Sequence, residues 1–146
     1  MPKKKIIIVD DEPLMSTLIK EIIDDDPVLE VSQITTKKDD FLNIVSKDHF
    51  DIALIDISMG SGKEGGLDVL SELKDKGLGM KVVMFSAHDE LSYARKCLQD
   101  GADGYISKEA ICSDLVKGLK EVVNGNLFVS GERGNDILEQ YKKSSG

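Results

Sequence analysis

Short apolar runs alternate with segments of helical periodicity along most of the chain, and this alternation is the strongest constraint on the fold. The apolar runs span residues 5–9, 29–34, 52–55, 81–85 and 104–106. Between them, apolar residues recur at helical spacing, most clearly over residues 13–23 and 111–123 and less cleanly over 37–46, 67–76 and 89–100. Strands that alternate with helices in this way form a parallel sheet with helices on both faces.

The strand order follows from the character of each run. The first, third and fourth runs are continuously apolar, as central strands buried on both faces should be, whereas "LEVSQI" alternates apolar with polar residues and is typical of an edge. With right-handed crossovers, this predicts an α/β, flavodoxin-like (βα)5 fold with a five-stranded parallel sheet of order 2-1-3-4-5. We expect one domain over residues 1–130 and no second domain. Residues 131–146 are expected to form a tail or the start of a linker, with a short helix through Ile137, Leu138 and Tyr141 that then frays.

Composition excludes several classes of function. The formal net charge is −8, whereas nucleic-acid-binding domains usually present a basic face, so we expect no nucleic-acid contact by this chain itself. No apolar stretch approaches the ~20 residues of a membrane helix, and no signal-peptide core follows the start. We therefore expect a cytoplasmic protein without a membrane contact. Cys97 and Cys112 fit no metal-ligand spacing and are interpreted as reduced thiols.

Polar residues follow four of the apolar runs at the point where each predicted strand ends. In chain order these residues are Asp10, Asp11, Glu12, Asp56, Ser86 and Lys108. The carboxyl ends of parallel strands meet at one edge of a sheet, and ligands bind there, near the point where the strand order reverses. We therefore expect Asp10, Asp11 and Asp56 to share a pocket. Taken singly, Asp11, Glu12 or Ser86 could be only a helix cap, and Lys108 only a surface lysine.

Three neighbouring carboxylates need a compensating cation. Two unit charges ~4 Å apart repel by about 4 kcal/mol at an effective dielectric of ~20. A hard divalent ion, Mg²⁺ or Mn²⁺, removes this repulsion, while Lys108 adds a fixed charge and Ser86 a hydroxyl that can bond an oxyanion. These are the groups that phosphoryl transfer requires. Asp56 stands alone at its strand end and is the expected nucleophile, with Asp10 and Asp11 on the metal-holding side.

These residues lie in motifs that resemble the receiver domain of bacterial response regulators. The matching segments are "IIIVDDEP", "DIALIDISM", "VVMFSA" and "GADGYISK", in the order of the family and over about residues 4 to 124. The segment "GADGYISKEA…GLKEVVNGNLFVS" is most similar to receivers that precede a LuxR-type helix-turn-helix. The resemblance implies that Asp56 accepts a phosphoryl group from a phosphohistidine, carried by a sensor histidine kinase or a phosphotransfer protein of a two-component system.

The resemblance also implies the ligands of the metal. Asp11 and Asp56 would ligate Mg²⁺ through their side chains, Ser58 through its carbonyl, and Asp10 largely through water. The chain would then be a self-phosphorylating acceptor with slow autodephosphorylation, and not a turnover enzyme.

The same resemblance implies a switch. Ser86 and Lys108 would bind the phosphoryl oxygens, and Tyr105 would be the aromatic residue that turns inward when Ser86 moves. The surface formed by the fourth helix, the fifth strand and the fifth helix, near Leu91, Ala94, Tyr105 and Ile111, would become the partner or homodimer face. Ser58 and His88 would flank the path of the attacking water and tune the lifetime of the phosphoryl group, although His88 could equally be an exposed loop histidine.

Three departures from the family pattern stand out. Gly60 follows Met59 where the family usually has proline. The family also has a glycine near eight residues past the acceptor, whereas "GSGKEGG" places Gly65 and Gly66 nine and ten residues past Asp56, which predicts a longer loop over residues 60–66. Glu109 follows the lysine where many receivers have proline, a trait of the LuxR-type subset. No DNA-binding domain follows, so the chain is either a stand-alone receiver or a fragment of a longer regulator.

Two other functions remain open at this point. The first is a receiver-like binding module that works without phosphorylation. The second is a Mg²⁺-dependent phosphatase that forms an aspartyl phosphate, although such enzymes often carry a second acid two residues after the nucleophile, where this chain has Ser58. A flavin carrier of similar topology would need a phosphate-binding loop after the first strand, where "DDEP" would repel a phosphate.

Overall fold

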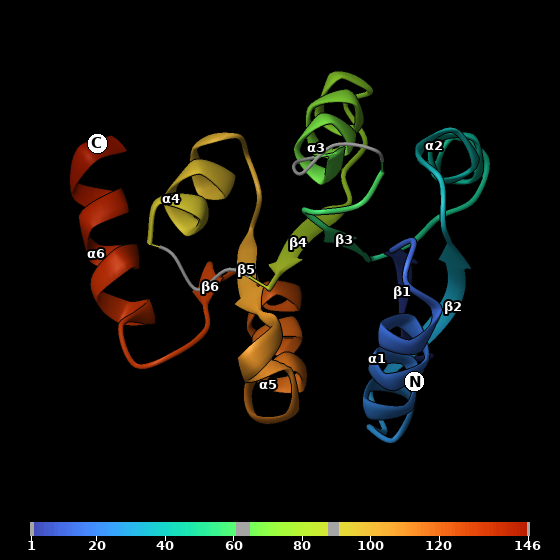
Figure 1. The fold of residues 1–146 in the computed structure, drawn as a ribbon, viewed down its shortest axis with the longest axis horizontal. Coiled ribbons are helices and arrows are strands. Elements are labelled where there is room, and N and C mark those ends of the chain that lie inside the picture. The colour runs from blue at the N-terminus through green and yellow to red at the C-terminus, as the bar shows by residue number, and fades with distance from the viewer. Residues whose placement is uncertain (1, 61–64, 88–90, 146) are drawn as a thin grey trace.

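The computed structural model describes residues 2–60, 65–87 and 91–145 and has a single parallel sheet between two layers of helices (Figure 1). The strands are β1 (Lys4–Val9), β2 (Leu29–Thr35), β3 (Ile52–Asp56), β4 (Lys81–Ser86), β5 (Gly104–Ser107) and β6 (Phe128–Val129). The helices are α1 (Pro13–Asp24), α2 (Lys38–Val45), α3 (Gly65–Asp75), α4 (Leu91–Gln99), α5 (Ile111–Val123) and α6 (Gly134–Ser145), with a 3₁₀ turn η1 (Lys108–Ala110) before α5.

The sheet confirms the predicted flavodoxin-like order and extends it by one strand. Its order is β2-β1-β3-β4-β5-β6, so the alternating segment β2 does lie at an edge. The sixth strand pairs Phe128 with Gly104 and Val129 with Tyr105. Sequence analysis expected five strands, because a two-residue strand is too short to show a periodic pattern.

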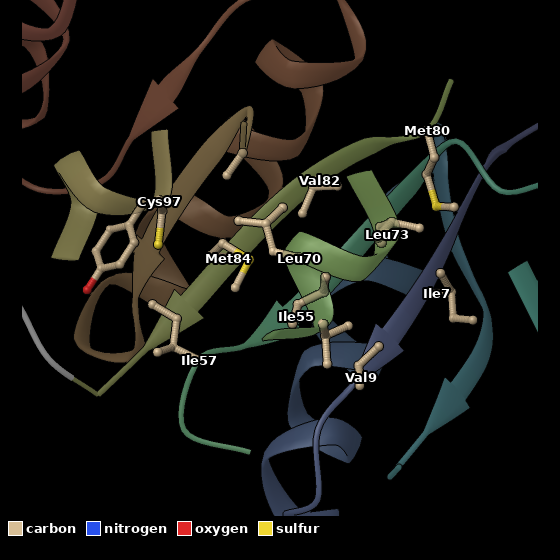
Figure 2. Close-up of a cluster of buried hydrophobic side chains, with 14 of the residues drawn as sticks. Ile7, Val9, Ile55, Ile57, Leu70, Leu73, Met80, Val82, Met84 and Cys97 are labelled. Atoms are coloured by element: carbon tan, nitrogen blue, oxygen red, sulfur yellow. The ribbon is translucent and has the colours of Figure 1, made fainter. Parts of the chain in front are cut away.

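The two faces of the sheet bury separate apolar clusters. Alternate residues of one strand point to opposite faces. Ile7 and Val9 therefore share a cluster with side chains of α2, α3 and α4, and Figure 2 shows Leu70 and Leu73 of α3 and Cys97 of α4 in it. Ile6 and Ile8 share the other cluster with side chains of α1 and α5. This is why β1 is a continuous apolar run: each face of the sheet needs every second residue.

The segment after α5 returns to the sheet and ends in α6, which lies beside α4 (Figure 1). Ile137 is buried, and Leu138 and Tyr141 pack partly buried against the α2–α4 side of the core. The predicted helix through these residues is confirmed, but it continues to Ser145 and does not fray after Tyr141. The division at residue 130 stays a prediction.

Two further observations bear on the sequence analysis. Both cysteines are free thiols, Cys97 in the core and Cys112 exposed. Within the described ranges, none of the helices combines the length and the apolar character that a membrane span requires.

Candidate functional site

The carboxyl ends of β1, β3, β4 and β5 carry the site. Val9 pairs with Ile55 in the β1–β3 register, so Asp10 emerges beside Asp56. One carboxylate oxygen from each of Asp10, Asp11 and Asp56 lies within 4.8 Å of the other two. The structure therefore brings together the three carboxylates that sequence analysis placed in one pocket.

Asp56 is buried and held by directed hydrogen bonds. Its side chain is 2% exposed. Its Oδ1 accepts hydrogen bonds from the Ser58 N–H at 3.1 Å and from the Ser58 hydroxyl at 3.0 Å, and its Oδ2 lies 3.3 Å from Lys108 Nζ. A charged carboxylate is tolerated in this buried place because a cation and two donors compensate for its lost hydration.

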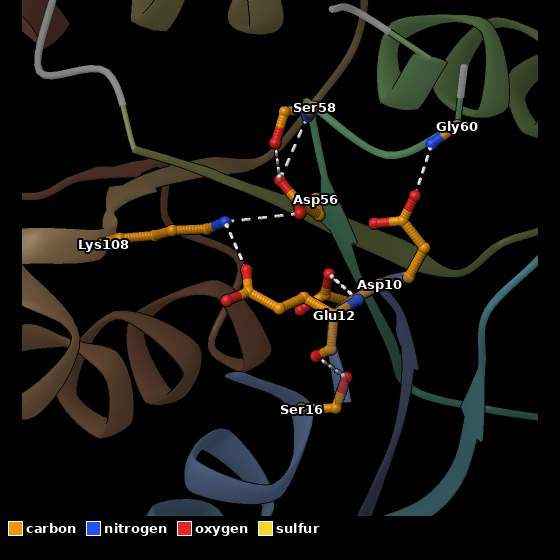
Figure 3. A network of polar contacts seen from close by, with 8 residues as sticks. Asp10, Glu12, Ser16, Asp56, Ser58, Gly60 and Lys108 are labelled. Atoms are coloured by element: carbon orange, nitrogen blue, oxygen red, sulfur yellow. Dashed lines mark hydrogen bonds and ion pairs between the residues drawn. The ribbon is translucent and has the colours of Figure 1, made fainter. Parts of the chain in front are cut away.

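Lys108 reaches the site from the turn after β5. Its Nζ lies 5.6 Å from the centre of the Phe85 ring, at a cation–π distance, and 3.9 Å from Glu12 Oε2 (Figure 3). The aromatic face and the two carboxylates fix the ammonium group above Asp56. Sequence analysis gave Glu12 no role at the site, and the ion pair with Lys108 is a contact that "DDEP" alone could not reveal.

Asp10 is the least compensated member of the cluster. It is fully buried, and its Oδ1 accepts a hydrogen bond from the Glu12 N–H at 3.0 Å, while its Oδ2 has no hydrogen-bond partner among the described residues. Burial, and in second place the Asp56 carboxylate beside it, raises the pKa of Asp10 to about 7. A buried carboxylate oxygen without a donor is an uncompensated acceptor, so a cation at this place would satisfy it.

Asp11 is exposed and connects the site to the loop after β3. Its Oδ2 accepts a hydrogen bond from the Gly60 N–H at 2.9 Å. On the other side of this loop, α3 begins against the backbone of Asp56, since a Cβ on Gly66 would lie 2.1 Å from the Asp56 carbonyl oxygen. Glycine at this place is therefore a requirement of close backbone approach. Residues 61–64 of the predicted longer loop lie outside the described residues.

The donor set fits a hard divalent cation. Mg²⁺ and Mn²⁺ prefer oxygen ligands, and Mg²⁺ usually takes one or two carboxylates and several waters. Asp10, Asp11 and Asp56 offer carboxylate oxygens at mutual distances that one ion can span. The carbonyl of Ser58 stays a predicted ligand.

The remaining predicted residues lie around this cluster. Ser86 is buried at the end of β4, directly after Phe85, whose register partner is Asp56. Tyr105 is 2% exposed and packs in the core on the α4 side, so its side chain already points inward in this structure. His88 lies outside the described residues.

No sequence pattern indicates the link between the end of β5 and the segment after β6. The Ser107 N–H donates a hydrogen bond to the Ser130 hydroxyl at 2.9 Å, and both serines are buried. Ser107 pairs with Ser86 on its other side. A single serine after a short apolar run has no recognisable pattern, so only the structure could reveal this contact.

The fold and the site together define an α/β protein with a buried acidic pocket and a lysine at the switch point of its sheet. The response regulator receiver domain matches residues 6–120, and the chain belongs to this family. The predicted family is thereby confirmed. Receiver domains are signalling phosphoacceptors, generally not turnover enzymes; they pair with sensor kinases and bind Mg²⁺ in an acidic pocket.

Known relatives agree with this family. The transcriptional regulatory protein DegU of Brevibacillus brevis is 28% identical over 141 residues, which cover 97% of this chain and 59% of DegU. The nitrate/nitrite response regulator protein NarL of Escherichia coli K12 is 28% identical over 125 residues, or 86% of this chain and 57% of NarL. The chain thus spans little more than half the length of these relatives.

A solved structure supports the fold. The two-component response regulator of the LuxR family from Aurantimonas sp. SI85-9A1 superposes with a TM-score of 0.82 at 18% identity, and the match covers 99% of both chains. At this identity the likeness concerns the fold alone. It includes the part of the chain that holds β6 and α6.

Proposed function

We propose that this chain is the phosphoacceptor of a two-component system and that Asp56 receives the phosphoryl group from a phosphohistidine of a sensor histidine kinase or a phosphotransfer protein. The observation that carries this proposal is the buried Asp56 carboxylate, held by Ser58 and Lys108 and set within 4.8 Å of two further carboxylates. One of these, Asp10, has a buried oxygen without a hydrogen-bond partner among the described residues.

The chemistry follows from this arrangement. A carboxylate oxygen of Asp56 forms a bond to phosphorus as the phosphorus–nitrogen bond of the donor breaks, and the electron pair leaves with the imidazole nitrogen. Asp11, Asp56 and the Ser58 carbonyl would hold Mg²⁺, with Asp10 reaching it through water, and the ion would supply positive charge to the phosphoryl oxygens when bound. Ser58 and Lys108 orient the Asp56 carboxylate, and burial keeps bulk water away from it.

The switch is proposed to begin with the added charge. A phosphoryl group on Asp56 brings negative charge and three acceptor oxygens, to which Lys108 and Ser86 bind. Lys108 Nζ lies 3.3 Å from Asp56 Oδ2, so it needs little movement to reach a phosphoryl oxygen. Ser86 moves at the end of β4, the neighbouring strand end of β5 and Tyr105 respond, and the surface of α4, β5 and α5 is remodelled. Ser58 and His88 are proposed to tune the rate of hydrolysis.

An apolar pair on α1 is proposed as part of the docking surface for the phosphodonor. Leu14 is 83% and Leu18 is 41% exposed, and they are one helical turn apart directly after the acidic segment of the site. Exposed apolar side chains beside a reaction centre favour contact with a partner. A phosphohistidine on a helix could be delivered to Asp56 while the helix packs on these two side chains.

The two alternatives make different demands on the site. A phosphatase would need a group that activates water quickly, but the residue two after Asp56 is Ser58, whose hydroxyl donates its hydrogen bond to Asp56. Slow autodephosphorylation fits this arrangement better. A binding module that works without phosphorylation would have no need for three close carboxylates and an uncompensated Asp10.

The test is labelling with a small phosphodonor. Incubation with acetyl phosphate and Mg²⁺, followed by intact-mass spectrometry, should add one phosphoryl mass to the wild type and to the control Asp68→Asn, which removes an exposed carboxylate on α3. Asp56→Asn should abolish the label. Labelling that survives Asp56→Asn refutes the acceptor, labelling by no donor supports the binding module, and rapid multiple turnover supports the phosphatase.

A further inference from the structure

Helix α6 covers part of the face that α4 and β5 present. Ile137 packs in the same cluster as Ala94 and Tyr105, which are 1% and 2% exposed. The Tyr141 hydroxyl donates a hydrogen bond to the Leu98 carbonyl at 3.2 Å. Figure 1 shows α6 lying alongside α4 at the outer end of the molecule. The chain itself thus covers part of the face that α4 and β5 form.

This cover buries few apolar side chains. Ile137 is the only α6 side chain among the described residues that is both apolar and buried, whereas α5 buries Ile111, Leu115, Leu119 and Val122. Most of the other described residues of α6 are exposed. Segments with few buried apolar contacts open locally at a lower free energy than the core. Helix α6 is therefore suited to leave its place while the rest of the fold stays intact.

The segment 130–133 between β6 and α6, which we call the joint, is hydrogen-bonded to β5, the strand that leads to Lys108. The Ser130 N–H donates to the Tyr105 carbonyl at 3.0 Å, and the Ser130 hydroxyl accepts from the Ser107 N–H at 2.9 Å. Ser107 pairs with Ser86 and directly precedes Lys108. A movement of the β4 end at Ser86 toward a phosphoryl group therefore changes the position of the Ser107 N–H, which donates its hydrogen bond to Ser130.

Space beside the joint allows such a movement. A cavity of about 770 Å³ lies between the start of α5 and the turn from β6 to α6, and Tyr105, Ser107, Ser130 and Ile137 are among its lining residues. The buried side chains at the joint thus have room on one side. Just beyond it, α6 begins in close contact with β6, because a Cβ on Gly134 would lie 1.9 Å from the Val129 carbonyl oxygen.

We infer that α6 is an autoinhibitory cover of the α4–β5 face, and that phosphorylation of Asp56 releases it through the Ser107–Ser130 contact. The inference rests on the proposed function for its trigger, but the cover and its joint are properties of the chain alone. Release exposes Ala94, Tyr105 and Ile137, which are buried while α6 is in place. Phosphorylation and release of α6 are then linked, so each favours the other.

Hydrogen–deuterium exchange of the full chain tests the release. After acetyl phosphate and Mg²⁺, with one phosphoryl mass confirmed, the amides of α6 should exchange at least about fivefold faster than before, while those of β1 and β3 should not change. Asp56→Asn treated in the same way should show no increase. Unchanged exchange of α6 in the phosphorylated wild type overturns the inference.

Two variants test the cover without phosphorylation. Gly134→Ala forces α6 away from Val129 and should expose α6 in the unmodified protein, whereas the control Asn135→Ala changes an exposed neighbour on the same helix. Ser130→Ala removes the acceptor of the Ser107 N–H and should speed exchange of α6 and of β5. Wild-type exchange of α6 in both variants overturns the inference. If no donor labels Asp56, the proposed function fails by itself, and these two variants still decide whether the cover and its joint exist.

If phosphorylation favours the release of α6, then release of α6 must favour binding of a phosphoryl group or its mimic, and this gives an equilibrium test of the coupling. Beryllofluoride, a phosphoryl mimic, should bind Gly134→Ala about fivefold or more tightly than it binds Asn135→Ala or the wild type, because the variant no longer has to release α6. Equal affinities, with α6 shown by exchange to be open in Gly134→Ala, would overturn the coupling.

Discussion

The centre of the sheet and its β5–β6 end differ in how densely they are packed. At the centre, β1 and β3 are buried on both faces, and this apolar frame holds Asp10 and Asp56 side by side although their charges repel. At the other end, β6 pairs through two residues and α6 buries one apolar side chain, Ile137. Dense packing can hold a destabilised polar group in place, whereas thin packing allows a segment to move. The site therefore lies at the centre of the sheet, and the proposed movement of α6 lies at its β5–β6 end.

The largest effect is expected from two glycines, one at the centre and one at the β5–β6 end, each of which lies against a backbone carbonyl oxygen. A Cβ on Gly66 would lie 2.1 Å from the Asp56 carbonyl oxygen, and one on Gly134 would lie 1.9 Å from the Val129 carbonyl oxygen. Gly66→Ala should lower the free energy of unfolding by about 3–5 kcal/mol, because neither Asp56 nor α3 can shift within the packed core. Gly134→Ala should lower it far less, because α6 can move away. Urea denaturation measures both.

Two measurements serve as controls for the two glycine variants. One is the m-value, the slope of the free energy of unfolding against urea concentration, and the other is labelling by acetyl phosphate. Gly134→Ala should still accept a phosphoryl group from acetyl phosphate, and Gly66→Ala should lose most of this activity. Equal destabilisation by the two substitutions would show that the centre of the sheet and its β5–β6 end are equally well packed. The proposed difference in packing would then be wrong.

The next effect concerns the destabilised carboxyl at the centre. The pKa of Asp10 rises from an ordinary value of 3.8 to about 7, first because of burial and then because of Asp56. Without metal, Asp10→Asn should raise the free energy of unfolding by about 2–4 kcal/mol at pH 8. The amide needs no charge in the buried site, and it offers a donor to the Asp56 carboxylate. Thermal and urea denaturation in the presence of a chelator measure the gain.

The sign of the pH dependence follows from the raised pKa. The folded protein holds the proton of Asp10 more tightly than the unfolded chain, so the free energy of unfolding falls as pH rises from about 3.8 to about 7 and stays low above that. The advantage of Asp10→Asn should therefore be largest above pH 7 and vanish near pH 4. Asp25→Asn, an exposed change after α1, should show no such trend. Mg²⁺ should reduce the advantage, because it compensates the Asp10 carboxylate of the wild type and stabilises the wild type more than the variant.

Predictions from the sequence were most accurate for the densely packed centre of the sheet. The continuous run Ile6–Val9 and the acids after it predicted a central strand and a charged pocket, because burial on both faces leaves a pattern in every residue. It missed β6 and the full length of α6, since a two-residue strand and a helix with one buried apolar side chain leave almost no periodic signal. The Ser107–Ser130 hydrogen bond joins residues far apart in the chain, and no local pattern encodes such a contact.

A smaller effect is expected on the outer surface of the site. Leu14→Ser should lower the rate of phosphotransfer from a phosphohistidine donor by about tenfold, since an exposed apolar anchor is lost from the docking surface. Labelling by acetyl phosphate should stay unchanged, because the Asp56 pocket is not altered. Leu78→Ser, which removes an exposed leucine from the loop before β4, is the matched control. An equal loss with both donors would mean that Leu14 supports the pocket and not the partner.

The smallest effect is expected from the hydrogen bond that ties α6 to α4. Tyr141→Phe keeps the ring against the core and removes only the hydrogen bond to the Leu98 carbonyl at 3.2 Å. That carbonyl also accepts a hydrogen bond from the Gly101 N–H at 3.1 Å, so no acceptor is left unsatisfied and the cost should be about 0.5–1 kcal/mol. Because α6 opens locally, the loss should appear as faster amide exchange in α6 alone, with the global free energy of unfolding unchanged. If the global value fell by the same amount, α6 would unfold together with the centre of the sheet, and thin packing at this end would not make it an independent unit.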